Sequence, residues 1–480
     1  MVFISRALPQ LVEIVNTELF RRLREKHGTF FEKFILSKLV PVVGNMCETN
    51  LGVEEDVANC IAREVDAIIN SAATTTVAER FDVALDLNMV AYASRQSEGK
   101  IIGQSRGKGN YVASSSDIFE APHKHDHGLD IKAEIKLASE MKKSLKENEI
   151  DQKLKDFGMS WAQEYGWPNT YAFTKAMGEM VVEDIKGHLP VIIIRPSVIE
   201  STLKEPFPGW IEDPVMHRMI DPFMLLYGKG KIPGFYSDPN IALDVVPVDI
   251  VVNSTLAAIA KHGSEESKPE DSNSSDDHVY QITSSVANPL ICRDLLDMAY
   301  QHFSLCPCFD RMGNPIHISA FKFFTSLKDF LSDMKNTNGN EKISPRKELI
   351  RRKSMEHLKY LAELYLPYSF FDGREVAILV PGFQQLVSIT YDVICLFISF
   401  MYSVLKMRNE KNSFLSKQTL SPYILVLLST VVSKLEEGVQ GLTAFPPVLG
   451  LSPDGGGTDA GGKAACVVWD AYVVWSCRER

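Results

Sequence analysis

The chain has 480 residues, of which 45% are hydrophobic and 23% charged, and its formal net charge is −10. That length accommodates about two or three domains, and the composition excludes a fibrous repeat and a wholly disordered chain. The acidic balance and the lack of a long basic run argue against a protein that binds nucleic acid, so we expect no nucleic-acid partner.

The N-terminal part alternates between helix and strand. We expect helices at 17–26 and 54–65, and buried strands at 38–44 and 65–70, the second of which ends in the polar turn Asn70-Ser-Ala-Ala73. Alternating helices and continuously apolar strands are typical of a doubly wound parallel sheet. The predicted fold class is therefore α/β and Rossmann-like.

The middle of the chain has a weaker pattern until about residue 169. A strongly charged helix is predicted over 141–157. Periodicity then returns with a helix at 171–185 and a buried strand at 189–195. A strand end and a helix follow across 244–260, and a further strand is predicted at 278–283.

Composition divides the chain into three parts. A Ser/Glu/Asp-rich linker at 264–277 precedes a second, mainly helical domain, and the composition changes again near residue 375. We expect domains at 1–285 and 286–374, followed by an irregular tail at 375–480. The tail contains one apolar segment, 386–405, which is a buried helix, a non-native tail or a membrane-associated helix.

Cysteine and histidine patterns predict no metal site. Eight cysteines in 480 residues, with no CxxC pair, fit reduced thiols better than a disulfide framework. Cys306-Pro-Cys308 has no second pair at zinc spacing, and the histidines of 123–127 lie in a polar loop.

The strongest chemical signal is Tyr171-Ala-Phe-Thr-Lys175. Positions i and i+4 of a helix share one face, so the lysine ammonium would lie near the phenol. An adjacent cation favours the phenolate, and such a tyrosine can give its proton to a carbonyl oxygen that is being reduced. A YxxxK spacing alone also occurs on many ordinary helix surfaces.

Two predicted strand ends give this pair a context. Asn70-Ser-Ala-Ala73 ends one strand, and Ile194-Arg-Pro-Ser197 ends another. Ligands of doubly wound sheets bind beyond the carboxyl ends of the strands. A plain turn before a helix and termination of a strand by proline are the alternatives for these two segments.

These residues lie within stretches that resemble the alcohol-forming fatty acyl-CoA reductases, an extended branch of the short-chain dehydrogenase/reductases, and most of all the plant members. The most specific runs are GWPNTYAFTKAMGEM at 166–180 and RPSVIESTLKEPFPGW at 195–210. The resemblance also covers 38–54, 69–88, 189–213 and 243–262, and a weaker region continues to about residue 373.

The resemblance implies reduction of a long-chain fatty acyl-CoA by NADPH, through an aldehyde, to a primary alcohol of wax or suberin-type lipid metabolism. It implies that Tyr171 is the proton donor, with Lys175 as its electrostatic partner and a contact to the ribose. Asn70, Ala72 and Ala73 would line the cofactor, and Pro196 and Ser197 would approach the nicotinamide. The helical domain at 286–374 would help to hold the acyl chain.

The resemblance also implies where the protein works. Related reductases act at the endoplasmic reticulum or in plastids, so we expect the endoplasmic reticulum surface or the cytoplasm, with the plastid as the alternative. Association with a membrane surface and a homodimer or a heterodimer with related reductases are further expectations.

The chain departs from the family pattern at two points. The glycine-rich GxxGxxG turn is expected upstream of Ile4, so we expect the chain to lack it. After Asn88, Met89 and Val90 stand where the family has hydroxyl residues that polarise the substrate carbonyl, and neither side chain can donate a hydrogen bond. We also expect one helix and one strand of the family to be deleted here. This deletion would leave a neighbouring strand unpaired. The alternative function is therefore a catalytically impaired form, or a fragment, that acts as a non-catalytic partner of full-length reductase.

Overall fold

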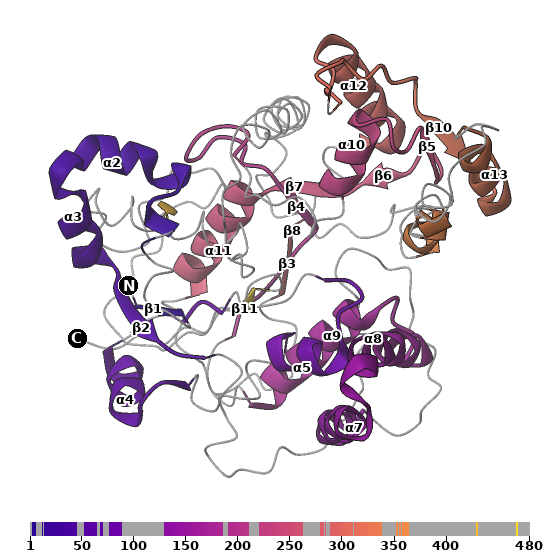
Figure 1. Ribbon diagram of the computed structural model, residues 1–480. Coiled ribbons are helices and arrows are strands. Elements are labelled where there is room, and N and C mark those ends of the chain that lie inside the picture. Colours follow the sequence, from indigo (N-terminus) through magenta and orange to yellow (C-terminus); the bar gives the residue numbers. More distant parts are fainter. Residues whose placement is uncertain are drawn as a thin grey trace.

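The computed structural model of the chain is a mixed α/β protein in which helices surround several short sheets (Figure 1). The residues that it describes are 2–5, 12, 14–45, 52–64, 68–70, 76–88, 129–185, 191–210, 220–262, 279–282, 284, 289–310, 312–337, 352–353, 355–356, 358–363, 429–430 and 467–468.

The helices in these ranges are η1 (Glu18–Phe20), α2 (Arg21–His27), η2 (Gly28–Phe30), α3 (Phe31–Lys38), α4 (Glu55–Glu64), α5 (Phe81–Asn88), α7 (Ile131–Ser144), α8 (Glu147–Glu164), α9 (Thr170–Ile185), α10 (Asp221–Gly228), α11 (Val248–His262), α12 (Cys292–Leu305) and α13 (Leu327–Thr337). The strands are β1 (Val2–Ser5), β2 (Val40–Val43), β3 (Ile193–Pro196), β4 (Val198–Glu200), β5 (Gly234–Tyr236), β6 (Ala242–Leu243), β7 (Val245–Pro247), β8 (Val279–Ile282), β9 (Leu290–Ile291), β10 (Lys322–Phe324) and β11 (Val467–Val468).

Strand β3 lies at the centre of the layer that carries the candidate site. It pairs in parallel with β8 and, on its other edge, with β11. Ile192 and Ile194 belong to a buried cluster with α11, whereas Val191 and Ile193 pack against Val182 of α9. A strand covered by helices on both faces is the arrangement of a doubly wound sheet, so the predicted α/β class is confirmed.

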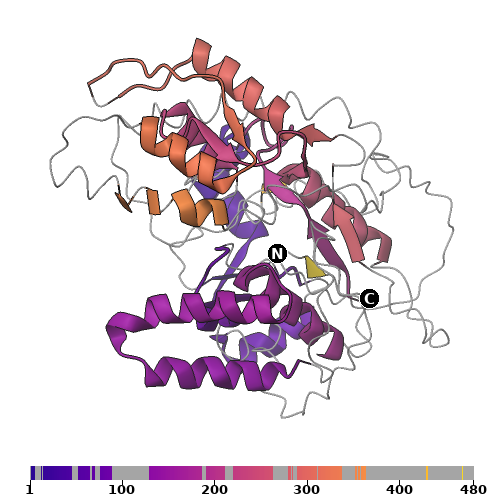
Figure 2. The same ribbon diagram turned by 90° about the vertical axis from the view of Figure 1, so that its right-hand side faces the viewer.

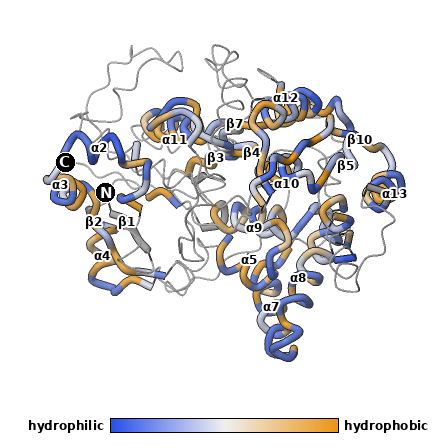
Figure 3. The backbone as a smooth tube through the Cα atoms, turned by 45° about the horizontal axis from the view of Figure 1, so that its top comes forward, coloured by the Kyte–Doolittle hydropathy of each residue, from blue (hydrophilic) through white to orange (hydrophobic). Residues whose placement is uncertain are grey.

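Helices α7 and α8 form an antiparallel hairpin beside α5 and α9 (Figure 2). The four helices share one buried cluster. Phe81 of α5 and Phe173 and Met177 of α9 lie in it, and Phe157 and Trp161 of α8 pack against it. Hydrophobic and hydrophilic residues alternate along α7 in Figure 3, as expected for an amphipathic helix with one face in solvent. This packing fixes one face of α9.

A second group of elements surrounds α10 and α12. Its buried cluster includes Met224 and Val245 from one side of the predicted boundary at 285/286, and Leu295 and Phe303 from the other. The chain on both sides of the linker therefore contributes to one core, and the three-part division of the chain stays a prediction.

The structure differs from the predicted elements at three points. The single helix predicted over 141–157 is two helices, α7 and α8, because Leu145 and Lys146 between them have extended backbone (ψ 151° and 147°). The predicted strand 65–70 contributes only a bridge at Asn70, and 65–67 lie outside the described residues. The buried strand predicted at 38–44 is β2, but Val40 and Val43 are about half exposed, because β2 pairs only with β1 in the described ranges.

The tail supplies a strand that the sequence does not predict. Val467 and Val468 pair with Ile193 and Ile194, so β3 has a partner on each edge. None of the helices in the described ranges combines the length and the hydropathy that crossing a bilayer requires. The apolar segment predicted at 386–405 lies outside those ranges.

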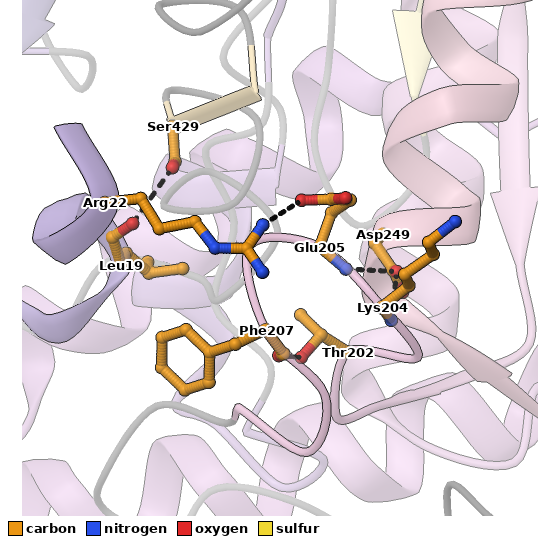
Figure 4. A network of polar contacts seen from close by, with 8 residues as sticks. All are labelled: Leu19, Arg22, Thr202, Lys204, Glu205, Phe207, Asp249 and Ser429. Atoms are coloured by element: carbon orange, nitrogen blue, oxygen red, sulfur yellow. Dashed lines mark hydrogen bonds and ion pairs between the residues drawn. The ribbon is translucent and has the colours of Figure 1, made fainter. Parts of the chain in front are cut away.

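A loop that begins at the end of β4 is held by a buried carboxylate. Asp249 at the start of α11 accepts hydrogen bonds from the backbone N–H groups of Leu203, Lys204 and Glu205 at 2.8, 2.9 and 3.1 Å. Figure 4 shows Lys204 and Glu205 beside Asp249. The Thr202 hydroxyl donates to the Phe207 carbonyl at 2.7 Å and closes the loop. This network fixes the chain just after β4, the strand that follows Ser197.

Asp82 connects α5 to its neighbours. Its carboxylate accepts hydrogen bonds from Arg80 and lies 2.9 Å from the Lys142 ammonium of α7. Burial alone raises the pKa of the Asp82 carboxyl, but the bonds from Arg80 and Lys142 outweigh it and hold the pKa below its ordinary value.

We predict that Asp82→Asn lowers the free energy of unfolding by about 1 to 3 kcal/mol at neutral pH. The folded-state pKa is below the unfolded-state value of about 4, so the Asp82 contribution is present above that value and disappears as the pH falls through the folded-state pKa. Urea unfolding at several pH values measures this. The control Glu140→Gln removes an exposed ion pair and should change little; an equal loss in both variants would contradict the prediction.

We also predict that Asp249→Ala lowers the free energy of unfolding by about 1 to 3 kcal/mol, because three backbone donors lose their acceptor. Hydrogen exchange should accelerate at Leu203, Lys204 and Glu205. The matched control is Glu205→Gln, which removes only an exposed pair with Arg22 (3.1 Å) and should leave the exchange of these amides unchanged. Unchanged exchange in Asp249→Ala would show that the carboxylate does not hold the loop.

Candidate active site

Helix α9 is fixed at its start by Asn169, whose Oδ1 accepts a hydrogen bond from the Ala172 N–H at 2.9 Å. Such an N-cap stabilises a helix by about 1 kcal/mol. The hydrophobic side chains of α9, including Phe173 and Met177, face α5 and α8. The predicted helix over 171–185 is thereby confirmed, and another face of α9 remains for polar side chains.

Tyr171 and Lys175 lie together on α9, as their spacing predicts. The Lys175 ammonium is 5.7 Å from the centroid of the Tyr171 ring, and the Lys175 side chain is fully buried, with 0% of its surface exposed. The Tyr171 N–H also donates to the carbonyl of Val77 at 3.4 Å, which connects the helix to the turn at 77–78. The structure thus places the ammonium of Lys175 beside the aromatic ring of Tyr171.

One turn further along α9, Glu179 forms an ion pair with Arg195 of β3. Arg195 donates from Nε to Oε1 at 3.0 Å and from its terminal nitrogen to Oε2 at 2.5 Å. Both side chains are almost fully buried. Burial raises the pKa of the Glu179 carboxyl, and Arg195 and Lys175 oppose that shift because each stabilises the carboxylate.

Of the predicted cofactor residues, the structure describes Asn70, Pro196 and Ser197. Pro196 ends β3, and Ser197 follows it with its N–H bonded to the carbonyl of Ile282 at 2.9 Å. Asn70 is half-buried, whereas Ala72 and Ala73 lie outside the described residues. The structure therefore brings Pro196 and Ser197 to the end of the strand whose Arg195 is bonded to α9.

Sequence reasoning missed the polar contacts that surround the pair. The Asn88 amide of α5 donates to the Thr174 hydroxyl at 2.9 Å, and both side chains are buried. Met89 and Val90, which follow Asn88, lie outside the described residues. Glu179 could have been found from its i+4 spacing to Lys175, but nothing in the sequence pairs it with Arg195.

Some buried groups of the site have no partner in the described part of the chain. The hydroxyls of Ser197 and Ser201, both buried, make no hydrogen bond there. A buried polar group without a partner costs stability unless a ligand or water satisfies it. Among the described residues there is no group of three or more His, Cys, Asp or Glu side chains that could hold a metal ion.

Comparison with known proteins identifies the family. The family model NAD_binding_4, described as "Male sterility protein", matches residues 10–255. The chain is 43% identical over 398 residues to "Fatty acyl-CoA reductase 2, chloroplastic" of Arabidopsis thaliana, an alignment that covers 75% of this chain and 63% of that protein. It is 31% identical over 398 residues to "Alcohol-forming fatty acyl-CoA reductase" of Simmondsia chinensis, which covers 75% and 77% of the two chains.

The chain thus spans a little under two thirds of the length of the first of these relatives. Among solved structures, the terminal R domain from the myxalamid PKS-NRPS biosynthetic pathway is 15% identical, with a TM-score of 0.39 and coverage of 90% of this chain and 84% of that chain. The assignment rests on the sequence matches, of which the family model alone spans about half of the chain. The chain belongs to the NAD-binding male sterility protein family, which includes the fatty acyl-CoA reductases.

Proposed function

We propose that the chain is a fatty acyl-CoA reductase that uses NADPH to convert a long-chain acyl-CoA to a primary alcohol. The observation that carries this proposal is the buried Lys175 ammonium beside the Tyr171 ring. An ammonium costs a great deal to bury, so such a group is retained where its charge is used. The relatives whose printed names describe fatty acyl-CoA reductases supply the substrate class.

The residues of the site have separate tasks in this reaction. NADPH, when bound, supplies a hydride to the carbonyl carbon in each of two reductions. Tyr171 gives its proton to the carbonyl oxygen, and Lys175 stabilises the negative charge left on the phenol oxygen. In the first reduction the thioester becomes an aldehyde and CoA leaves as its thiol; in the second the aldehyde becomes the alcohol.

The described residues fit a nicotinamide cofactor at the end of β3. The unpartnered hydroxyl of Ser197 is a hydrogen-bonding group available to a ligand, and Pro196 leaves no N–H beside it. Ligands of doubly wound sheets bind at such strand ends. Asn70, Ala72 and Ala73 remain proposed contacts to the same cofactor, and NADPH in preference to NADH rests on the family resemblance.

The location of the protein is part of the same proposal. One relative is named chloroplastic, which favours the plastid over the endoplasmic reticulum or the cytoplasm. Association with a membrane surface and dimerisation with related reductases stay predictions. Imaging of a C-terminal fluorescent fusion tests the choice of compartment, and a signal confined to the endoplasmic reticulum would overturn it.

We predict that the purified chain oxidises NADPH when a long-chain acyl-CoA is added, and that fatty alcohol accumulates. Tyr171→Phe should lower the rate at least about 100-fold, because general acid catalysis contributes that much or more. The fall in NADPH absorbance measures consumption of the cofactor, and mass spectrometry measures the alcohol that forms. NADH tested in parallel should support a slower reaction.

The matched control is Tyr280→Phe. Tyr280 also lies beside a lysine, since the Lys261 ammonium is 5.8 Å from its ring centroid, but that lysine is exposed on α11. This variant should keep the rate of the unaltered chain. If the unaltered chain consumes no NADPH above the blank, the proposed activity is wrong and a non-catalytic partner role takes its place.

A further inference from the structure

Helix α9 presents three polar side chains in one row. Tyr171, Lys175 and Glu179 follow one another at intervals of four residues, so they lie above one another on the same face. Lys175 has none of its surface exposed and Glu179 only 3%. Burying the charges of Lys175 and Glu179 this deeply is costly unless groups of opposite charge offset the loss of hydration.

Arg195 of β3 contacts this row from the neighbouring strand, through its bonds to Glu179. Along β3, the residues before it alternate between α11 and α9, and Arg195 continues the face of Val191 and Ile193 toward α9. Its bidentate bonds fix both oxygens of the Glu179 carboxylate. Because a guanidinium stays charged in proteins, this pairing favours an ionised Glu179.

Glu179 is therefore bonded to one buried cation, Arg195 of the strand, and lies one helical turn from a second, Lys175, whose charge stabilises the carboxylate. We propose that Glu179 is a positioning residue of the reductase site. Its carboxylate, fixed by Arg195, holds the Lys175 ammonium beside Tyr171 and ties α9 to the strand end with Pro196 and Ser197. This inference rests on the function proposed above, since it assigns Glu179 a task in that reaction.

If the pair of Glu179 and Arg195 only connected α9 to β3, a different result would be expected. The stability contributed by Lys175 would then not depend on the Glu179 carboxylate. If Glu179 also holds Lys175, removing the carboxylate leaves two buried cations without their shared counter-charge. The coupling between Glu179 and Lys175 separates the two cases.

The first test is a double-mutant cycle on the stability of the full chain. Glu179→Gln, Lys175→Met and the double variant are unfolded in urea and compared with the unaltered chain. We expect Lys175→Met to destabilise the unaltered chain but to stabilise the Glu179→Gln background, with a coupling of at least about tenfold in the unfolding equilibrium constant. Additive effects, within about twofold, would overturn the proposal. If Glu179→Gln does not fold, Lys175→Met is tested in the Glu179→Met/Arg195→Met background, where it should also stabilise.

The second test separates positioning from packing. Glu179→Met/Arg195→Met removes both members of the pair, and apolar replacements of a buried ion pair often preserve stability. We expect a folded chain that is less stable than the unaltered one because Lys175 stays buried, an unchanged KM for the acyl-CoA and a kcat at least about tenfold lower, because Lys175 is no longer held. A native kcat in this folded variant would show that the pair is only structural. If the unaltered chain shows no turnover, the proposed function fails, and the stability cycle still decides the role of Glu179.

Discussion

The candidate site depends on one interaction, the burial of the Lys175 ammonium beside an aromatic ring and one helical turn from a carboxylate. A lysine without exposed surface loses the hydration of its charge, and this loss must be offset by groups that favour the cation. The Tyr171 ring at 5.7 Å and the carboxylate of Glu179 one turn away provide such groups. The local chemistry and the local stability of α9 therefore depend on the same atoms.

The surrounding fold fixes the position of α9, and therefore of Tyr171 and Lys175, relative to β3. The hydrophobic face of α9 packs into the cluster with Phe81 and Phe173, while Val182 packs against β3. The bonds between Arg195 and Glu179 then align the helix with the end of the strand. After the next strand, β4, the carboxylate of Asp249 fixes the loop that follows. The rigid elements thus place the phenol and the strand end as one unit.

Sequence reasoning succeeded where local periodicity decides the structure. The helix at 171–185 and the pair Tyr171/Lys175 follow from a spacing of four residues, and the structure confirms the helix and the proximity of the two side chains. The break at Leu145 could not be predicted, because the charged pattern continues across it. The sequence identifies Arg195 only as part of a predicted strand end, since its partner lies 16 residues away and periodicity carries no information about such contacts. The same holds for Val467 and Val468, whose pairing with β3 joins distant parts of the chain.

The most direct measurement of the central claim follows deuterium from the 4-position of NADPH into the alcohol. The account predicts that both new C–H bonds at carbon 1 of the alcohol carry deuterium, and that Lys175→Met forms this product far more slowly than the unaltered chain. Deuterated alcohol formed by Lys175→Met at an unchanged rate would contradict the role of the buried ammonium. Absence of deuterated alcohol from the unaltered chain would contradict the proposed reaction itself.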